Sequence, residues 1–216
     1  MIIPRHKGSV AKWTFENGLV QQLNWQVLEQ SLISCSTVAS ILSSYKLLST
    51  NTIRLSVWMR AGEQNVSQSN RIEKADISFS VDPSNPFMDT LSLCHSILDS
   101  EYVYPLTVEI LGSGAIVTDH DDIFVDDLVW LRARTMDTFS ISVITQSDVW
   151  LPFSLQGEPQ HATCSLNADR LANALQEIRQ QTGFNLEEGV ESYYSVIKGF
   201  RLENIRYADG SIADVS

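Results

Sequence analysis

The sequence predicts an α+β domain, and three observations carry that prediction. Several stretches alternate apolar and polar residues, as strands with one buried face do. Other stretches repeat apolar residues at steps of three and four, as amphipathic helices do. The two kinds of stretch do not alternate strictly along the chain, which argues against a parallel βαβ arrangement. We therefore expect a single domain over residues 1–216, with a mixed or antiparallel sheet and three to four helices packed on it.

The composition agrees with one globular unit. The chain has 216 residues, of which 44% are apolar and 19% are charged, so it can bury a substantial core. No internal repeat and no Pro/Gly/Ser-rich linker divides it. A polar stretch near residues 61–75 is the place where we expect a soft division, if there is one.

The first half of the chain is expected to open with a β-hairpin over residues 8–20, with Asn17-Gly18 as its turn. A helix over residues 25–48 follows. Its predicted buried face consists of Leu28, Leu32, Cys35, Ala39 and Leu42. Alternation then predicts strands over residues 51–60 and 75–81, and residues 87–98 have the spacing of another helix.

The second half is expected to contain a second hairpin, formed by residues 106–111 and 115–118 around a Gly-Ser-Gly turn. A helix over residues 121–132 should follow, because aspartates precede the apolar positions and arginines end them. Its predicted inward residues are Ile123, Phe124, Leu128 and Leu131.

The last third of the chain begins with a predicted strand over residues 138–144. Residues 148–153 read as an extended aromatic segment, because Pro152 prevents regular strand pairing. The clearest predicted helix covers residues 168–182, with Asn167 as its N-cap and Gly183 as its stop. Its inward residues are Leu171, Leu175 and Ile178, and one more strand is expected over residues 196–207.

The formal charge of −11 is unevenly distributed. Residues 1–75 hold eight Lys or Arg and four Asp or Glu, and residues 128–216 hold seven and eleven. Between them, residues 76–127 hold eleven Asp or Glu and no Lys or Arg. This acidic block cannot neutralise itself. Either the basic N-terminal third folds against it, or it presents a negative field to a partner.

Several classes of function are disfavoured by the sequence. The absence of a concentrated Lys/Arg patch argues against nucleic-acid binding. The most apolar stretch, residues 31–48, is interrupted by seven Ser or Thr and a Lys, which favours a buried helix over a membrane span. With no signal-peptide pattern at its start, we expect a cytoplasmic protein. Its three cysteines, Cys35, Cys94 and Cys164, form no C-x-x-C and are expected to be buried thiols.

The most concentrated group of chemically active residues is TDHDDIFVDD, residues 118–127. Asp119 and Asp121 have the Asp-x-Asp spacing of some Mg²⁺ or Mn²⁺ sites, and His120 could add a nitrogen ligand. The EF-hand pattern fails, however, and neither H-E-x-x-H nor H-x-H occurs. The same residues could support a metal-dependent hydrolase, but no linear enzyme motif accompanies them: the chain has no Walker loop, no G-x-G-x-x-G and no G-x-S-x-G.

Two other interpretations of this cluster use no metal. Aspartates can cap a helix and line its solvated side. Alternatively, the cluster forms an acidic face that binds a cationic partner. The partner-binding aspartates would be Asp119, Asp121, Asp122, Asp126 and Asp127.

Trp150 and Phe153, in the segment SDVWLPFSLQGEP, allow two interpretations as well. They could anchor a long loop in the core, or they could form the aromatic part of the binding surface, where such rings contribute most of the binding free energy.

The function that the sequence favours is a non-catalytic protein-binding module. Its acidic face would capture a basic protein partner, because opposite charges accelerate association. One concrete version is a cytoplasmic immunity protein that neutralises a cationic toxin domain. The alternatives are a metal-dependent hydrolase that uses Asp119, His120 and Asp121, and a structural subunit of a larger assembly. The leading interpretation requires no cofactor and no metal.

Overall fold

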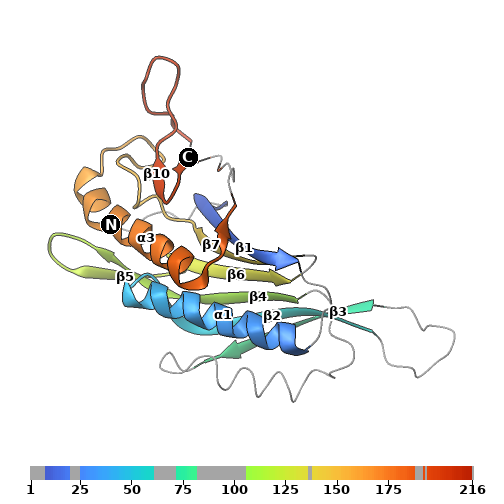
Figure 1. The fold of residues 1–216 in the computed structure, drawn as a ribbon. Coiled ribbons are helices and arrows are strands. Elements are labelled where there is room, and N and C mark those ends of the chain that lie inside the picture. Colours follow the sequence, from blue (N-terminus) through green and yellow to red (C-terminus); the bar gives the residue numbers. More distant parts are fainter. Residues whose placement is uncertain are drawn as a thin grey trace.

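The protein is built on one antiparallel sheet, seen in a computed structural model that describes residues 8–19, 25–60, 72–81, 106–135, 138–187, 192 and 194–215 (Figure 1). Within the described residues, the sheet has eight strands. Seven follow the order β3-β2-β4-β6-β7-β1-β8, and β5 pairs with β4 off this path. Every pairing in it is antiparallel.

The described strands range from two to twelve residues in length. They are β1 (Ala11–Leu19), β2 (Ser49–Arg60), β3 (Ile72–Ser80), β4 (Leu106–Val117), β5 (Asp122–Asp126), β6 (Val129–Thr135), β7 (Thr138–Thr145), β8 (Asn185–Leu186), β9 (Val196–Lys198) and β10 (Arg201–Glu203). The last two form a separate small hairpin.

Two helices, α1 (Trp25–Ser44) and α3 (His161–Thr182), lie on the same face of the sheet (Figure 1). α1 contacts β2, β4 and β6, and α3 contacts β4 and α1. The core between the helices and the sheet contains every second residue of the central strands. Examples are Ile53, Leu55, Val108, Ile110, Leu131, Ala133, Ile141 and Val143, all at most 1% exposed. Burial of this apolar surface is the main stabilising contribution to the fold.

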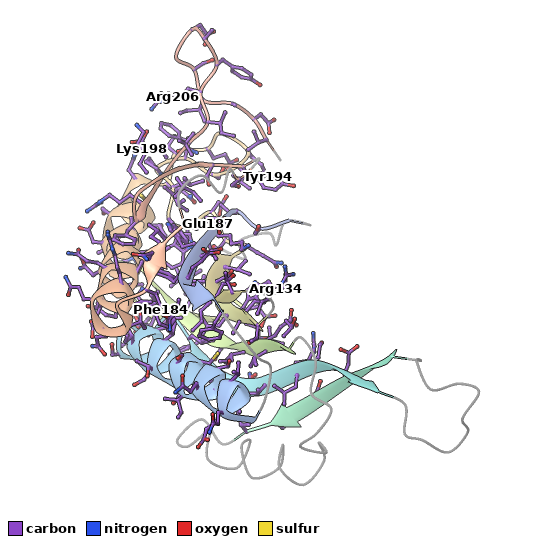
Figure 2. All side chains as sticks on the ribbon, turned by 45° about the vertical axis from the view of Figure 1, so that its right-hand side comes forward. Arg134, Phe184, Glu187, Tyr194, Lys198 and Arg206 are labelled. Atoms are coloured by element: carbon purple, nitrogen blue, oxygen red, sulfur yellow. The ribbon has the colours of Figure 1, made fainter. Side chains whose placement is uncertain are left out.

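The opposite face of the sheet is polar, as the alternation requires. Glu109 on β4 lies between two arginines, Arg54 on β2 and Arg132 on β6, at distances of 3.3 and 2.9 Å. Figure 2 shows Arg134 on the side of the sheet away from α3, and Phe184 on the side that α3 covers. Phe184 packs edge-to-face on Phe139.

The predicted number of helices is wrong. The part of the chain that the structure describes contains two helices and a predominantly β architecture, instead of three to four helices on a sheet. The helix predicted for residues 121–132 is replaced by β5 and β6. The helix predicted for residues 87–98 lies outside the described residues, as does most of the possible division near residues 61–75.

Residues 121–132 match a helical pattern but pair with β4 instead. Asp127 has a φ of 51°, which interrupts a helix and bends the chain between β5 and β6. Its amide donates to the Gly112 carbonyl at 2.6 Å. The apolar side chains at helical spacing therefore separate: Leu128 and Leu131 are buried, whereas Ile123 and Phe124 are exposed.

Both predicted hairpin turns are also wrong, for different reasons. Gly18 has a φ of 52° at a register shift between β1 and β7, so Asn17-Gly18 forms a bulge within one strand. Gly112 and Gly114 lie inside the continuous strand β4. A Cβ at either position would overlap the main-chain oxygen of Ser49 or Leu47, respectively. These two glycines allow a close approach of backbones and do not form a turn.

The predicted helix over residues 25–48 is confirmed, but it ends earlier. Lys46 adopts a left-handed conformation with a φ of 55°. The amides of Lys46 and Leu47 bond back to Ser43 and Leu42, both at 2.8 Å. This is the Schellman arrangement that ends many helices. The predicted inward residues Leu32, Cys35, Ala39 and Leu42 are buried.

The C-terminal helix was predicted with the correct end and the wrong start. Gly183 ends α3 with a φ of 68°, and Leu171, Leu175 and Ile178 are buried, as predicted. The helix begins at His161, and Gln160 is its N-cap. Asn167 is therefore a buried residue inside α3 and not its cap. Beyond it, residues 196–203 form the β9–β10 hairpin where one strand was predicted.

No helix in the described ranges is long and apolar enough to cross a membrane.

Candidate protein-binding surface

Residues 118–127, which we call the acidic arm, form the turn after β4 and the strand β5. Thr118 closes the turn. Its Oγ1 donates to the Asp121 carbonyl at 2.8 Å and accepts from the amides of His120 and Asp121 at 3.3 and 3.1 Å. The Thr118 amide also donates to the Asp121 carbonyl, at 3.2 Å. Three amides and one carbonyl of the turn are thus satisfied internally. The side chains of Asp119, His120 and Asp121 are exposed to solvent.

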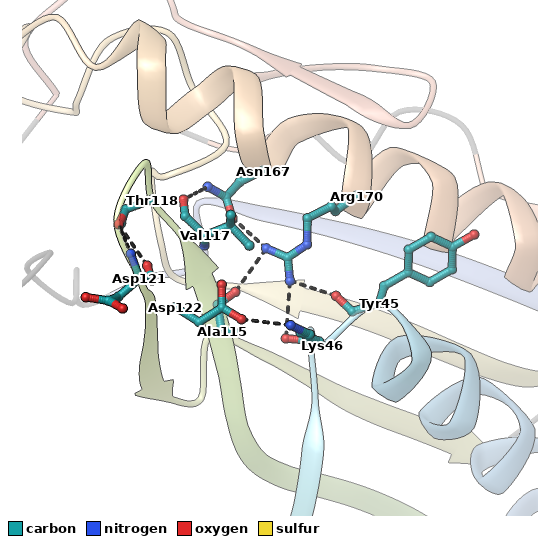
Figure 3. Close-up of polar contacts among 9 residues, drawn as sticks. All are labelled: Tyr45, Lys46, Ala115, Val117, Thr118, Asp121, Asp122, Asn167 and Arg170. Atoms are coloured by element: carbon teal, nitrogen blue, oxygen red, sulfur yellow. Dashed lines mark hydrogen bonds and ion pairs between the residues drawn. The ribbon is translucent and has the colours of Figure 1, made fainter.

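The end of β4 next to this turn is held by the side chain of Asn167 from α3 (Figure 3). The amide of Val117 donates to Asn167 Oδ1 at 3.0 Å, and Asn167 Nδ2 donates to the Val117 carbonyl at 2.8 Å. One side-chain amide thereby replaces the two hydrogen bonds that a neighbouring strand would make. This contact fixes the base of the acidic arm to α3.

Arg170, one turn further along α3, joins three elements. It donates to the carbonyls of Ala115 on β4 and Tyr45 after α1, at 3.1 and 2.7 Å, and to Asn167 Oδ1 at 2.6 Å. Because a cation near the C-terminus of a helix is favourable, Arg170 also stabilises the end of α1. Burial lowers the pKa of Arg170, and the negative charge of Asp122 opposes that shift.

The charge of the arm is only partly compensated. The carboxylate of Asp122 is 2.8 Å from the Nζ of Lys46, which belongs to the basic N-terminal third. Arg54 of the same third pairs with Glu109 of the acidic block. The side chains of Asp119 and Asp121 have no ion-pair or hydrogen-bond partner within the described ranges. These two carboxylates form the charged tip of the arm.

Beside the charged tip, β5 exposes apolar side chains. Phe124 is 68% exposed and Ile123 is 39% exposed, whereas Val125 packs against the core. Single exposed apolar residues are common on protein surfaces, so the exposure of this ring does not by itself mark a binding site. The arm therefore combines a charged turn with an exposed aromatic ring.

The two aromatic residues predicted for the binding surface lie elsewhere. Trp150 is 1% exposed, and its Nε1 donates to Thr145 Oγ1 at 2.9 Å inside the core. Phe153 is half-buried and packs edge-to-face on His161. The main chain of Phe153 is held by the side chain of Asn204, at 3.1 and 2.8 Å. The surface that we consider below therefore includes the five aspartates and omits both rings.

The geometry does not gather metal ligands at the arm. Across the described part of the chain, no group of three or more His, Cys, Asp or Glu side chains is placed to hold a metal ion. Asp119, His120 and Asp121 follow one another around an exposed turn. The hydrolase alternative thus has no assembled metal site among these residues.

Phe124 is the residue of this surface that sequence reasoning missed. It was predicted to face inward from a helix, and it points outward from a strand. A signal was present: D-I-F-V-D consists of β-branched and aromatic residues between acidic ones, which is typical of a short strand at a sheet edge.

Comparisons with protein-family models, with curated proteins and with solved structures found no match to this chain.

Proposed function

We propose that the protein is a non-catalytic binding protein whose acidic arm captures a basic protein partner. The observation that carries the proposal is the contrast between two groups of acids in the same cation-free block. Glu109 is neutralised by two arginines, whereas Asp119 and Asp121 are exposed on a turn that is held rigidly by Thr118. Unpaired carboxylates on a rigid turn lose little conformational freedom on binding and steer a cationic partner by charge.

The concrete version of the proposal is a cytoplasmic immunity protein that neutralises a cationic toxin domain. A nuclease has a positively charged site for its substrate, and a rigid acidic turn is complementary to such a site. This function requires neither a cofactor nor a metal. The net charge of −11 also supports a protein partner over nucleic acid.

The test is affinity capture from a lysate of the native host with three forms of the protein, followed by mass spectrometry. The first form is wild type, and the second is Asp119→Lys with Asp121→Lys. The third, Glu158→Lys with Glu187→Lys, changes the net charge equally at two exposed acids outside the arm.

We expect wild type and the Glu158/Glu187 variant to capture the same basic protein in equal amounts. The arm variant should capture at most one tenth of that amount. Capture by wild type should also fall as salt is added, because exposed charges are screened. Equal retention by the arm variant would show that the acidic arm is not the binding surface.

A further inference from the structure

An open cavity of about 400 Å³, which we call the interhelical cavity, lies between α1 and α3. Most of its lining is polar, with a carboxylate and an amide from α3 and four hydroxyls from α1: Glu177, Gln181, Ser36, Thr37, Ser40 and Ser44. The two helices lie side by side on the sheet (Figure 1), and the small side chains of α1 leave space between them. Small-molecule sites have volumes of roughly 300–1,000 Å³, so this cavity is large enough for a small ligand.

The charge of the cavity comes from Glu177, whose carboxylate is held in place by two neutral donors. Its Oε2 accepts from the hydroxyl of Tyr45 at 2.9 Å, and its Oε1 accepts from Gln181 Nε2 at 2.6 Å. Figure 3 shows the ring of Tyr45 beside α3. The hydrogen bond to Glu177 raises the pKa of Tyr45, so this hydroxyl remains a donor. The carboxylate is therefore oriented without being neutralised.

No cation of the described ranges forms an ion pair with Glu177, since the ion pairs found there join other residues. Arg170 lies two turns earlier on the same helix, but its guanidinium donates to the carbonyls of Ala115 and Tyr45 and to Asn167. A fixed carboxylate without a counter-ion binds a cationic donor through charge-assisted hydrogen bonds, which are stronger than neutral ones.

The hydroxyls of α1 add acceptors to this charge. Thr37 and Ser44 donate their protons to main-chain carbonyls of α1, at 3.1 and 2.7 Å, so toward a ligand their oxygens can only accept. The hydroxyls of Ser36 and Ser40 have no hydrogen-bond partner within the described ranges and can accept as well. The interhelical cavity is thus rich in acceptors around one carboxylate, which suits a positively charged ligand with several N–H donors.

The length of the cavity favours a chain with a donor at each end. Ser36 and Ser44 are eight residues apart in α1, which corresponds to about 12 Å along the helix axis. One ammonium on Glu177 leaves part of this hydroxyl row unused, and a second ammonium on the same chain reaches it. The buried side chain of Ile41, which also lines the cavity, supplies an apolar contact for methylene groups between them.

We propose that the interhelical cavity binds a short aliphatic diamine, with one ammonium on Glu177 and the other on the hydroxyls of α1. This site goes beyond the proposed function, because it uses neither the acidic arm nor a protein partner. A lysine side chain of another protein carries the same ammonium but lacks the second one, so a free diamine is the better match.

The test is isothermal titration calorimetry of the wild-type protein with three probes of equal chain length. Cadaverine carries two ammonium groups, pentylamine carries one, and pentanediol carries two hydroxyls and no charge. We expect cadaverine to bind, pentylamine to bind about threefold more weakly or worse, and pentanediol to show no binding. Absence of cadaverine binding at millimolar concentration would overturn the inference.

Two matched pairs of variants locate the site. Glu177→Gln removes the charge but can still accept from Tyr45, and Glu158→Gln removes an exposed acid elsewhere. Ser40→Leu fills the cavity, whereas Ser43→Leu adds the same side chain at an exposed position of α1 outside its lining. We expect Glu177→Gln and Ser40→Leu to weaken cadaverine binding about tenfold, and both controls to bind like wild type. Circular dichroism should show all four variants folded.

Three other results would overturn the diamine site. Equal weakening by Glu177→Gln and Glu158→Gln would mean that cadaverine responds only to net charge. Pentanediol binding as tight as that of cadaverine would identify a neutral polyol as the ligand. Binding of Nα-acetyl-lysine methylamide as tight as that of cadaverine would assign the ammonium to a protein side chain.

The inference and the proposed function can fail separately. The variant with Asp119→Lys and Asp121→Lys should bind cadaverine like wild type, because neither residue lines the interhelical cavity. Glu177→Gln should in turn leave capture of the basic partner unchanged. A cavity that does not bind cadaverine therefore leaves the acidic arm untouched, and loss of the partner leaves the diamine site standing.

Discussion

The two halves of strand β4 have different neighbours. Residues 107–110 pair with β2 on one edge and with β6 on the other, and their acidic side chain, Glu109, lies between Arg54 and Arg132. Residues 114–117 pair with β5 on one edge, and no other described strand pairs with them. Their other edge is satisfied by the Lys46 carbonyl and by side chains from Asn167 and Arg170.

The difference shows how one strand can serve both stability and binding. In the first half the single acid, Glu109, is paired with two arginines, and the main chain pairs with a strand on each edge. In the second half two side chains from α3 hold β4 in place, so β5 can stay at the edge of the sheet. The acids beyond it remain exposed. Three predictions test this division, from the largest effect to the smallest.

Gly114→Ala is expected to have the largest effect. An added Cβ would overlap the Leu47 main chain, which connects α1 to β2 and cannot move without disturbing both. We expect the free energy of unfolding to fall by about 3 kcal/mol. Urea unfolding followed by circular dichroism would measure it, with Ser113→Ala as the control that adds no Cβ. A Gly114→Ala variant as stable as that control would show that the close approach is not required.

Arg170→Met is expected to have the next largest effect. It keeps the aliphatic length of the side chain but leaves the carbonyls of Ala115 and Tyr45 without their donor. We expect a loss of about 2 kcal/mol in the free energy of unfolding. Arg179→Met, an exposed change on the same helix, is the matched control in the same urea titration. Equal stability of the two variants would mean that Arg170 does not hold the second half of β4.

Glu109→Gln and Asp121→Asn compare the two acids directly. Glu109 is 17% exposed between two arginines, so its neutralisation should lower the free energy of unfolding by about 1 kcal/mol. The carboxylate of Asp121 makes no contact within the described ranges that stabilises the fold, so Asp121→Asn should leave the unfolding midpoint unchanged while weakening partner capture. The opposite pattern, with Asp121 stabilising and Glu109 neutral, would contradict the assigned roles.

Local sequence patterns correctly predicted the helices and strands whose apolar residues repeat at the spacing of that element. The inward faces of α1 and α3 were correct because side chains at steps of three and four must lie on one face, whatever packs there. The strands β2 and β7 were correct because alternation over seven or more residues has no helical equivalent. The end of α3 was correct because Gly183 adopts a left-handed conformation at little cost.

Glycine and asparagine were misjudged where their role depends on distant residues. Positions 112 and 114 require glycine because the backbones of Ser49 and Leu47 approach them closely. No residue nearby in the sequence indicates this approach. Asn167 has the residue type of a cap, but it bonds to Val117, fifty residues away in the chain. In both cases local chemistry allows a common local role, and long-range packing assigns another.

The sequence alone determined the buried faces of the two helices, some of the strands and the uneven distribution of charge. Tertiary structure decided which acids are exposed, because Glu109 meets its arginines only across paired strands. It also decided that residues 122–126 form an edge strand, since five residues with mixed periodicity adopt the conformation that their neighbour β4 stabilises. A short segment gains too little from its own hydrogen bonds to fix its structure, so the fold around it selects one.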